Sequence, residues 1–317
     1  MRVLVTGASG FVGLHLIRLL NSRGHTIYGT AILGGRTERV PGARIFRCDI
    51  RDGARLRAIV RRVRPQRVYH LAAFSSVVNS FGDFRSVYET NFWGTFNVLE
   101  AVRQEAPKAR VLVVGTGQCY GAALSSRLPV AESQPLSPQS PYALSKAVAD
   151  MLAAQYHQRF GLHIIRARPF NHTGPGQASE FVCSDWARQI ASAELRLTPP
   201  TLRVGDLTVQ RDFSDVRDVV RAYELLLEKG KPGEAYNVGS GRATPMRQIA
   251  KLLTGFSSLP IQVRVQSRRL RPGEARALYG SIRKLTRDTG WKPKYNLEST
   301  LSDLYFYWKE QLLPERH

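Results

Sequence analysis

The fold is decided by the segment Val3-Leu4-Val5-Thr6-Gly7-Ala8-Ser9-Gly10-Phe11-Val12-Gly13. Its short apolar start predicts a buried parallel strand, and the amphipathic residues 14–20 that follow predict a helix. Glycines in the spacing GxxGxxG connect the two. A strand, a glycine turn and a helix together place a pyrophosphate at the N-terminus of the helix. The segment therefore predicts a dinucleotide-binding fold; the alternative is a tight strand-to-helix turn without a ligand.

Apolar strand-like runs alternate with helical patterns along the first half of the chain. The strands are predicted near residues 2–6, 25–30, 43–47, 67–72, 110–115 and 162–167, and the helices near 11–23, 52–63, 83–106 and 141–160. This alternation predicts an α/β protein with a Rossmann-type doubly wound parallel sheet and helices on both faces.

Beyond residue 168 the elements become shorter and the alternation ends. We expect a smaller C-terminal α/β lobe that binds the substrate, built from residues 169–210 and 240–317. A helix over 215–227 and a strand over 235–238 are expected to return to the main sheet, so that 1–168 and 211–239 form the dinucleotide-binding domain. The predicted place of the chemistry is the cleft between the two, beyond the carboxyl ends of the strands.

The composition excludes several classes of protein. With 317 residues, 43% of them hydrophobic and 22% charged, the chain has globular composition and can bury a large core. No apolar run is long enough to cross a bilayer, and a strand that starts at Arg2 leaves no room for a cleavable signal. Cys48, Cys119 and Cys183 are scattered, which indicates free thiols in a reducing cytoplasm. We expect a cytoplasmic protein with no membrane partner and no bound metal.

The formal net charge of +21 has three explanations. It would mark a nucleic-acid-binding surface, attract phosphate-bearing ligands, or reflect arginine-rich solvated faces. The arginines are dispersed, as they are around the predicted helix 52–63, and no nucleic-acid-binding motif accompanies them. We favour the third explanation and expect no nucleic-acid partner.

Tyr142 and Lys146 form a candidate catalytic pair. Ser140 suits a helix cap and Pro141 suits the first helical position, so a helix is predicted to begin here. A spacing of four residues places the phenol and the ammonium on one helical face. A nearby cation favours the phenolate and lowers the pKa of Tyr142, which would make this side chain a general acid or base. Thr116 follows the predicted strand 110–115. Its hydroxyl would donate a second hydrogen bond to the substrate oxygen with which Tyr142 exchanges a proton.

Together these features resemble the extended short-chain dehydrogenase/reductase family over nearly the whole chain. In the first half the resemblance is carried by the glycine turn, Asp49-Ile50, residues 70–73 (HLAA), residues 90–95 (TNFWGT), Thr116 four residues before Tyr120-Gly121, and the Tyr142/Lys146 pair. In the second half, residues 168–177 (RPFNHTGPGQ), 211–213 (RDF) and 271–274 (RPGE) are similar to the GDP-sugar branch of that family.

The resemblance implies NADPH-dependent reduction of the C4 ketone of GDP-4-keto-6-deoxy-D-mannose to a GDP-6-deoxyhexose, GDP-D-rhamnose. The alternatives are a GDP-mannose 4,6-dehydratase, a nucleotide-sugar 4-epimerase, or a dinucleotide-binding protein without catalysis. Similar dehydratases carry an acid just after the threonine, whereas this chain has Thr116-Gly117-Gln118. Because an amide is no base at neutral pH, this position favours the reductase.

The resemblance also implies the cofactor contacts. The second strand ends in residues 28–36 (YGTAILGGR) without an acid and with Arg36 nearby, which favours NADP(H), with NAD(H) as the alternative. Asp49 would bond the adenine amino group, or would cap the helix that follows Asp52. The expected cofactor-binding residues are Gly7, Ser9, Gly10, Phe11, Val12, Gly13, Arg36, Asp49, Ile50, Leu71, Ala72, Ala73, Asn91, Tyr142, Lys146 and Pro169.

Substrate-binding residues follow from motif position in the same resemblance. Arg211 and Arg271 would bind the pyrophosphate through their forked donors, and Asn171 would add an amide. The expected set is Ser75, Ser76, Thr116, Gln118, Asn171, Phe181, Val182, Arg188, Arg211, Arg271 and Glu274. Each of them has an alternative role as a surface or capping residue. The resemblance further implies a homodimer through the helices 83–106 and 141–160.

Overall fold

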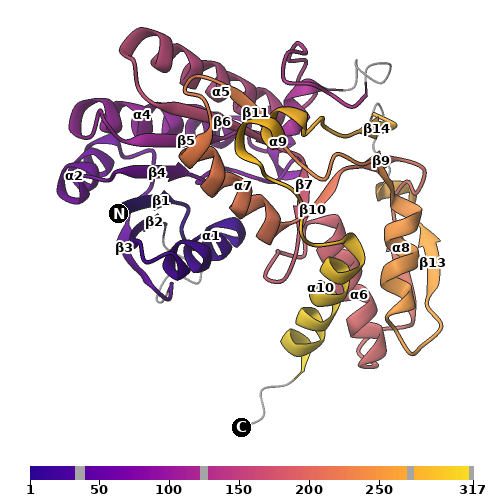
Figure 1. The fold of residues 1–317 in the computed structure, drawn as a ribbon. Helices are drawn as coiled ribbons and strands as arrows, with labels where there is room; N and C mark the ends of the chain where they lie inside the picture. The colour runs from indigo at the N-terminus through magenta and orange to yellow at the C-terminus, as the bar shows by residue number, and fades with distance from the viewer. Residues whose placement is uncertain (33–39, 122–127, 270–274, 314–317) are drawn as a thin grey trace.

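The computed structural model describes residues 1–32, 40–121, 128–269 and 275–313. Within these residues the centre is a seven-stranded sheet in the order β11-β6-β5-β4-β1-β2-β3 (Figure 1). The strands are β1 (Arg2–Thr6), β2 (Thr26–Ala31), β3 (Ala43–Arg47), β4 (Arg67–His70), β5 (Arg110–Val114), β6 (Ile164–Pro169) and β11 (Ala235–Val238). All neighbouring strands are parallel, which confirms the predicted Rossmann-type α/β fold.

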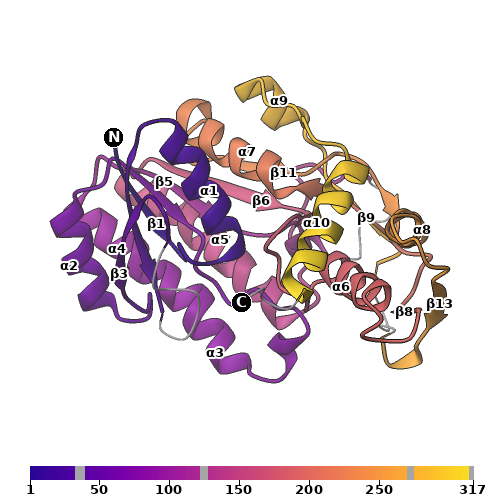
Figure 2. The same cartoon turned by 90° about the horizontal axis from the view of Figure 1, so that it is seen from below.

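Helices cover both faces of this sheet (Figures 1 and 2). They are α1 (Phe11–Ser22), α2 (Gly53–Val63), α4 (Gly94–Glu105), α5 (Pro141–Phe160), α7 (Val216–Lys229) and α9 (Arg283–Thr289). Val3 and Val5 of β1 pack with α1 and α7 on one face, whereas Leu4 packs with α2, α4 and α5 on the other. Successive side chains therefore enter opposite cores, as expected for a strand buried on both faces.

Helix α5 begins and ends where the sequence predicts. Ser140 Oγ accepts a hydrogen bond from the Ala143 amide at 3.1 Å, and Pro141 occupies the first turn. Gly161 ends the helix in the left-handed conformation, with φ at 67°. Both ends are set by local residue types, which is why the pattern located them.

The predicted helix 83–106 is helical but not uniformly α-helical. It consists of α3 (Phe84–Tyr88), a π-helical turn η2 (Glu89–Trp93) and α4. Thr95 Oγ1 donates to the Asn91 carbonyl at 2.6 Å, which competes with the regular helical hydrogen bond at this point. Such π-turns are frequent at functional sites.

The smaller lobe lies beside one end of the sheet in Figure 1. Its elements are α6 (Val182–Glu194), α8 (Met246–Gly255), α10 (Leu297–Leu312), β8 (Thr201–Val204), β9 (Gln210–Arg211), β12 (Thr244–Pro245), β13 (Gln262–Val265) and β14 (Ala277–Leu278). Trp186, Ile190, Leu253 and Leu304 are core residues where the three helices meet. The pair β7 (Asn171–Thr173) and β10 (Phe213–Asp215) leads from the sheet into this lobe.

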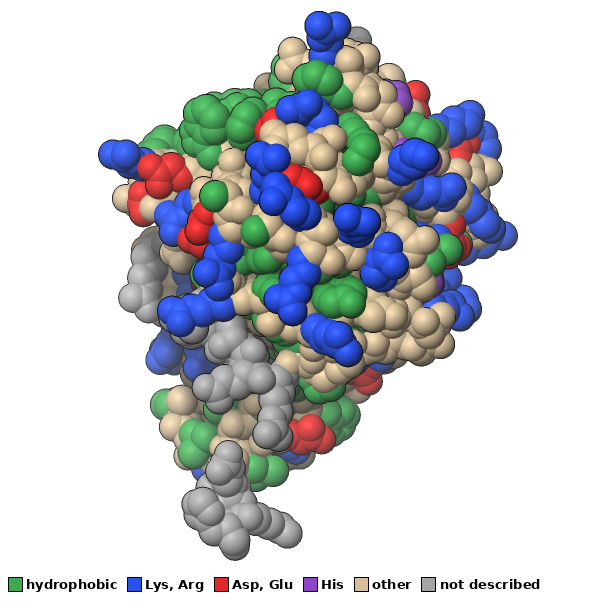
Figure 3. Space-filling view, turned by 90° about the vertical axis from the view of Figure 1, so that its left-hand side faces the viewer, with side chains coloured by type: hydrophobic (Ala, Val, Ile, Leu, Met, Phe, Trp, Pro, Cys, Tyr) green, Lys and Arg blue, Asp and Glu red, His purple; other side chains and the backbone are tan. Residues whose placement is uncertain are grey.

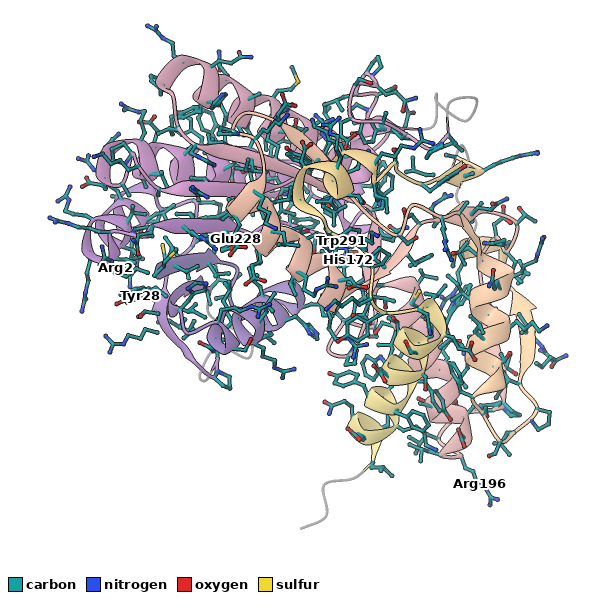
Figure 4. All side chains as sticks on the ribbon, viewed as in Figure 1. Arg2, Tyr28, His172, Arg196, Glu228 and Trp291 are labelled. Carbon is teal, nitrogen blue, oxygen red and sulfur yellow. The ribbon has the colours of Figure 1, made fainter. Side chains whose placement is uncertain are left out.

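Part of the C-terminal segment packs on the main core instead of the lobe. Leu285 of α9 and Trp291 belong to the same buried cluster as α1 and α7. The Trp291 indole donates to the Asp218 carbonyl at 3.0 Å, and Figure 4 shows Trp291 beside α7. The division of the chain into two domains stays a prediction. The structure adds that residues after 280 pack on the core of the main sheet.

Basic side chains spread over the face on the α2 side of the molecule, with fewer acidic ones between them (Figure 3). Some are paired: Glu105 accepts from Arg57 at 2.6 Å and from Arg61 at 2.9 Å. Among the described helices none has the length and apolarity that a membrane span requires. Cys48, Cys119 and Cys183 are buried free thiols.

Candidate active site

The nucleotide turn is so tight that two of its glycines admit no side chain. Gly7 has a φ of +70°, and a Cβ there would lie 2.8 Å from the Ala72 nitrogen. A Cβ on Gly13 would lie 2.4 Å from the Gly7 carbonyl oxygen. Gly7 requires glycine for both its left-handed conformation and its contacts, whereas Gly13 requires it for its contacts alone. The turn after β1 is thereby held against the segment that follows β4.

Helix α1 begins at this turn with uncapped amide groups. Gly10 is its N-cap residue, no side chain accepts a hydrogen bond there, and the first turn contains no acid. The N–H groups of Phe11, Val12 and Gly13 have no partner within the helix, and the helix dipole favours negative charge at this end. The residues present therefore fit a phosphate group of a dinucleotide.

Thr116, Tyr142 and Lys146 come together at the carboxyl edge of the sheet. Thr116 follows β5 and caps the short helix η3 (Gly117–Tyr120), and its hydroxyl makes a hydrogen bond with Tyr142. Lys146 lies one turn along α5 from Tyr142 and is 5% exposed. Among the described residues, no hydrogen-bond or ion-pair partner meets the Lys146 ammonium. Its donors are available to a ligand, as the predicted role of Lys146 in cofactor binding requires.

Burial determines the proton affinities of this group. It raises the pKa of Tyr142 to about 12, and the hydrogen bond with Thr116 lowers that pKa only in part. Burial also lowers the pKa of Lys146 to about 8, which the Asp150 carboxylate opposes. The prediction of a lowered Tyr142 pKa is therefore wrong for this structure, because desolvation of the phenolate is the largest contribution and raises that pKa. A phenol that stays protonated at neutral pH is nonetheless the form that a proton donor needs.

Asn91 connects the loop after β4 to the helix that carries Tyr142. Its Oδ1 accepts from the Phe74 amide at 2.8 Å, and its Nδ2 donates to Ser145 Oγ at 2.9 Å. Ser145 Oγ in turn donates to the Tyr142 carbonyl at 2.8 Å. Asn91 is one of the predicted cofactor residues, whereas Phe74 and Ser145 are not. The spacing of three residues between Tyr142 and Ser145 is the sequence signal that indicates the second of these contacts.

His70, at the end of β4, is a second connecting residue. Its Nδ1 lies 2.8 Å from Thr6 Oγ1 and its Nε2 lies 2.9 Å from Thr95 Oγ1. Burial, followed by the charge of Lys146, lowers its pKa to about 3, so the ring is neutral at physiological pH. It joins β1, β4 and α4 beneath the nucleotide turn.

The remaining predicted cofactor residues surround the turn. Asp49 forms an ion pair with Arg51 at 2.6 Å, whereas Asp52 caps α2, so the alternative role of Asp49 as that helix cap is wrong. Arg36 lies outside the described residues. Ser9, Ile50, Leu71, Ala73 and Pro169 lie on the turn or at the carboxyl ends of β1, β3, β4 and β6. Their contacts with a cofactor stay predictions.

The predicted substrate residues fall into two groups. Ser75 and Ser76 follow the loop after β4, where Ser76 Oγ accepts from the Asn79 amide at 3.2 Å, and Gln118 lies on η3 next to Thr116. The others belong to the lobe or to its connection with the sheet: Asn171 in β7, Phe181 as the N-cap residue of α6, Val182 and Arg188 on α6, and Arg211 in β9. Arg271 and Glu274 lie outside the described residues. Their substrate contacts stay predictions.

Two further polar residues of the second half, His172 and Asp212, belong to the motifs of residues 168–177 and 211–213, and His172 is expected to be a structural hydrogen-bond partner. His172 lies between the sheet and the lobe (Figure 4), with its ring stacked on Phe11 at a centroid distance of 6.2 Å. Asp212 is fully buried and accepts from the Ser240 amide at 2.7 Å and the Gly241 amide at 3.0 Å. It fixes the loop after β11 next to Arg211, a role that only long-range contacts reveal.

The family model described as GDP-mannose 4,6 dehydratase matches residues 4–304. The chain belongs to this family. The GDP-6-deoxy-D-mannose reductase of Pseudomonas aeruginosa is 35% identical over 314 residues, with 99% of each chain covered. A structure of RMD from Pseudomonas aeruginosa complexed with NADPH matches with a TM-score of 0.86 and 33% identity, covering 98% of this chain and 99% of that one. A UDP-glucose 4-epimerase from Thermus thermophilus in complex with NAD matches with a TM-score of 0.86 and 30% identity, covering 98% and 99%.

This dehydratase family lies within the extended short-chain dehydrogenase/reductases, so the predicted family is confirmed. The prediction of an NAD(P)-dependent oxidoreductase is confirmed with it. Because the family contains reductases, dehydratases and epimerases, the residues of the site are needed to choose among these reactions.

Proposed function

We propose that the protein reduces the C4 ketone of GDP-4-keto-6-deoxy-D-mannose with NADPH and forms GDP-D-rhamnose. The observation that carries the proposal is a proton-donor group of Thr116, Tyr142 and Lys146 beside an amide, Gln118, where a dehydratase needs a carboxylate. The 35% identity to a GDP-6-deoxy-D-mannose reductase over the full length supports the same reaction.

The chemistry divides between the cofactor and the protein. NADPH, when bound, supplies the hydride. Tyr142 donates the proton to the ketone oxygen, and the Thr116 hydroxyl donates a hydrogen bond to the same oxygen as negative charge develops there. The Lys146 ammonium binds the nicotinamide ribose and adds positive charge on the same side. An alkoxide is much more basic than a phenolate, so proton transfer from a phenol with a pKa of about 12 is favourable.

The cofactor preference and the remaining contacts belong to the same proposal. The described end of β2, Thr30 and Ala31, lacks an acid that would repel a 2′-phosphate, which supports NADP(H). Asn171 and Arg211, with Arg271, would bind the pyrophosphate of the GDP-sugar, and Phe181, Val182 and Arg188 would line the base. Val182 is 38% exposed at the start of α6 and is therefore accessible to a ligand.

We further propose a homodimer that forms through the helices of residues 83–106 and 141–160. Leu144 and Met151 are exposed on α5, and Trp93 is exposed at the end of η2. Leu144 and Met151 are seven residues apart and thus share one helical face, the arrangement that a partner helix would cover. The buried free thiols favour the reducing cytoplasm as the compartment.

A dehydratase is the second candidate, because the matching family model bears that name. The two are separated by supplying the purified protein either with GDP-mannose alone or with NADPH and GDP-4-keto-6-deoxy-D-mannose made in situ. Oxidation of NADPH in proportion to a new 6-deoxyhexose supports the reductase, and NMR of the product identifies rhamnose. Conversion of GDP-mannose without added cofactor, and no oxidation of NADPH, would refute it.

A further inference from the structure

A buried carboxylate lies one helical turn beyond Lys146. Asp150 follows Lys146 by four residues on α5, so the two side chains share a helical face, and Asp150 is 2% exposed. Its Oδ1 accepts from Arg168 Nε at 3.1 Å. Its Oδ2 accepts from Arg168 Nη2 at 2.8 Å and from Arg166 Nη1 at 2.7 Å. One carboxylate is thus shared between two guanidinium groups beneath the catalytic lysine.

Arg168 continues this network toward Thr116. Its Nη1 donates to the Tyr120 hydroxyl at 2.9 Å, and that hydroxyl donates to Asn237 Oδ1 at 2.8 Å. Tyr120 ends η3, the short helix that Thr116 caps. Arg168 and Tyr120 belong to the motifs of this chain, yet neither has a part in the proposed chemistry. The network places both in one buried cluster with Asp150.

Few charged groups lie near the buried Lys146 ammonium. Near Lys146 and Asp150, the titratable and charged groups are Tyr142 of α5, His70 of β4, Cys119 of η3, and Arg166 and Arg168 of β6. The segments α3, η2 and α4 also pack on α5, and their carboxylates Glu89 and Glu100 are paired with Arg85 and Arg103. His70 is neutral, and burial raises the pKa of Cys119 to about 12, so that thiol is neutral as well. Within the described residues, Asp150 is therefore the anion that opposes desolvation of the ammonium.

We propose that Asp150 is a positioning residue that keeps Lys146 as an ammonium ion beside Tyr142, and that Arg166 and Arg168 limit how strongly its charge acts. The assignment of Lys146 to catalysis rests on the proposed function. Substitutions in this cluster should therefore shift the pKa of Lys146 in opposite directions. Neutralising Asp150 removes the negative charge that stabilises the ammonium, whereas removing Arg166 leaves more of that negative charge to act on Lys146. A cluster that only joins α5 to β6 would lose stability in both variants without moving the lysine titration.

The test is a direct titration of Lys146 by NMR in full-length protein labelled with [ε-13C]lysine, with Lys146→Met to assign the signal. Asp150→Asn is expected to lower the pKa of Lys146 by about one unit, the lower end of the effect of one opposite charge, because Arg166 and Arg168 screen part of the Asp150 charge. Arg166→Gln is expected to raise it. Asp150→Glu keeps the charge and is the matched control, with a pKa near that of the parent protein.

An unchanged pKa in Asp150→Asn and Arg166→Gln would overturn the proposal, as would shifts of both variants in the same direction. Asp150→Asn leaves Arg168 buried without its counterion and is the variant at risk of not folding. The Arg166 side chain is 16% exposed, so its replacement is better tolerated. If Asp150→Asn does not fold, Arg166→Gln decides the question by itself: a raised pKa of Lys146 supports the proposal and an unchanged pKa overturns it. The titration needs no substrate, so it is independent of the proposed function. If the pKa of Lys146 shifts as expected in a protein that does not reduce the GDP-sugar, only the proposed function is refuted. In an active enzyme, the pH at which kcat falls on the alkaline side is expected to shift in the same direction as the pKa of Lys146.

Discussion

Replacing Gly13 by alanine is the perturbation whose cost is most directly readable from the nucleotide turn. The new Cβ would lie 2.4 Å from the Gly7 carbonyl oxygen and 2.8 Å from the Ala8 carbonyl oxygen. Carbon and oxygen atoms in proteins approach to about 3.3 Å, so the turn must move by about 0.9 Å. Both contacts are with backbone atoms, which have no alternative rotamer. Such overpacking costs about 1–3 kcal/mol of folding free energy.

The same movement displaces the amides that would bind the cofactor phosphates. A charge-assisted hydrogen bond contributes about 1.5–3 kcal/mol, so the loss of one such bond raises the Kd for NADPH by about 10- to 100-fold. Urea unfolding measures the first effect, and fluorescence titration with NADPH measures the second.

Gly255→Ala is the matched control for this substitution. Gly255 ends α8, and a Cβ there meets no atom within 4 Å. Alanine at that helical position should stabilise the protein by about 0.5–1 kcal/mol and leave the Kd for NADPH unchanged. If Gly13→Ala unfolded at the same urea concentration as the parent protein and bound NADPH equally well, the assignment of this turn to the cofactor would be refuted.

Three further predictions address catalysis, cofactor choice and pH dependence. Tyr142→Phe should reduce turnover by at least about 100-fold, the contribution of a general acid, and leave NADPH affinity nearly unchanged; normal turnover would remove Tyr142 from the mechanism. Arg36→Ala should weaken NADPH binding more than NADH binding, and equal losses in parallel titrations would exclude Arg36 from the 2′-phosphate site. Glu100 accepts two hydrogen bonds of 2.8 Å from Arg103, which lower the pKa of its carboxyl to about 2. A lowered carboxyl pKa stabilises the folded state above the unfolded pKa of about 4.3, and this stabilisation disappears as the pH falls toward 2. Glu100→Gln should therefore be less stable than the parent protein at pH 7 by about 0.5–1 kcal/mol, because solvent screens this partly exposed ion pair, and the unfolding curves of the two should converge in acid; a difference that persisted there would contradict the assignment.

The nucleotide turn and the start of α5 could be predicted because their signals are local. The glycine spacing in residues 7–13 indicates a turn in which backbone segments lie too close together for a side chain. The distances from a Cβ at Gly7 or Gly13 to neighbouring backbone atoms show this close approach. Ser140 and Pro141 define the first turn of α5 by their own hydrogen-bonding and dihedral preferences.

The connections beneath the site could not be predicted, because they join residues far apart in the chain. Asn91 bonds Ser145 across 54 positions, and Asp150 bonds Arg168 across 18. Each of these side chains would suit a solvated surface equally well. Likewise, no periodicity shows that α9 leaves the lobe to place Leu285 and Trp291 in the main core.

The sequence by itself determined that a Tyr–Lys pair shares a helical face near a dinucleotide turn, since helical spacing follows from residue numbers alone. Only the tertiary structure decided the protonation states of that pair. The spacing predicted a phenol made acidic by its neighbour, whereas burial holds the pKa of Tyr142 at about 12 and that of Lys146 at about 8. Desolvation depends on every atom that excludes water from the site, and those atoms are contributed by strands and helices from across the whole chain.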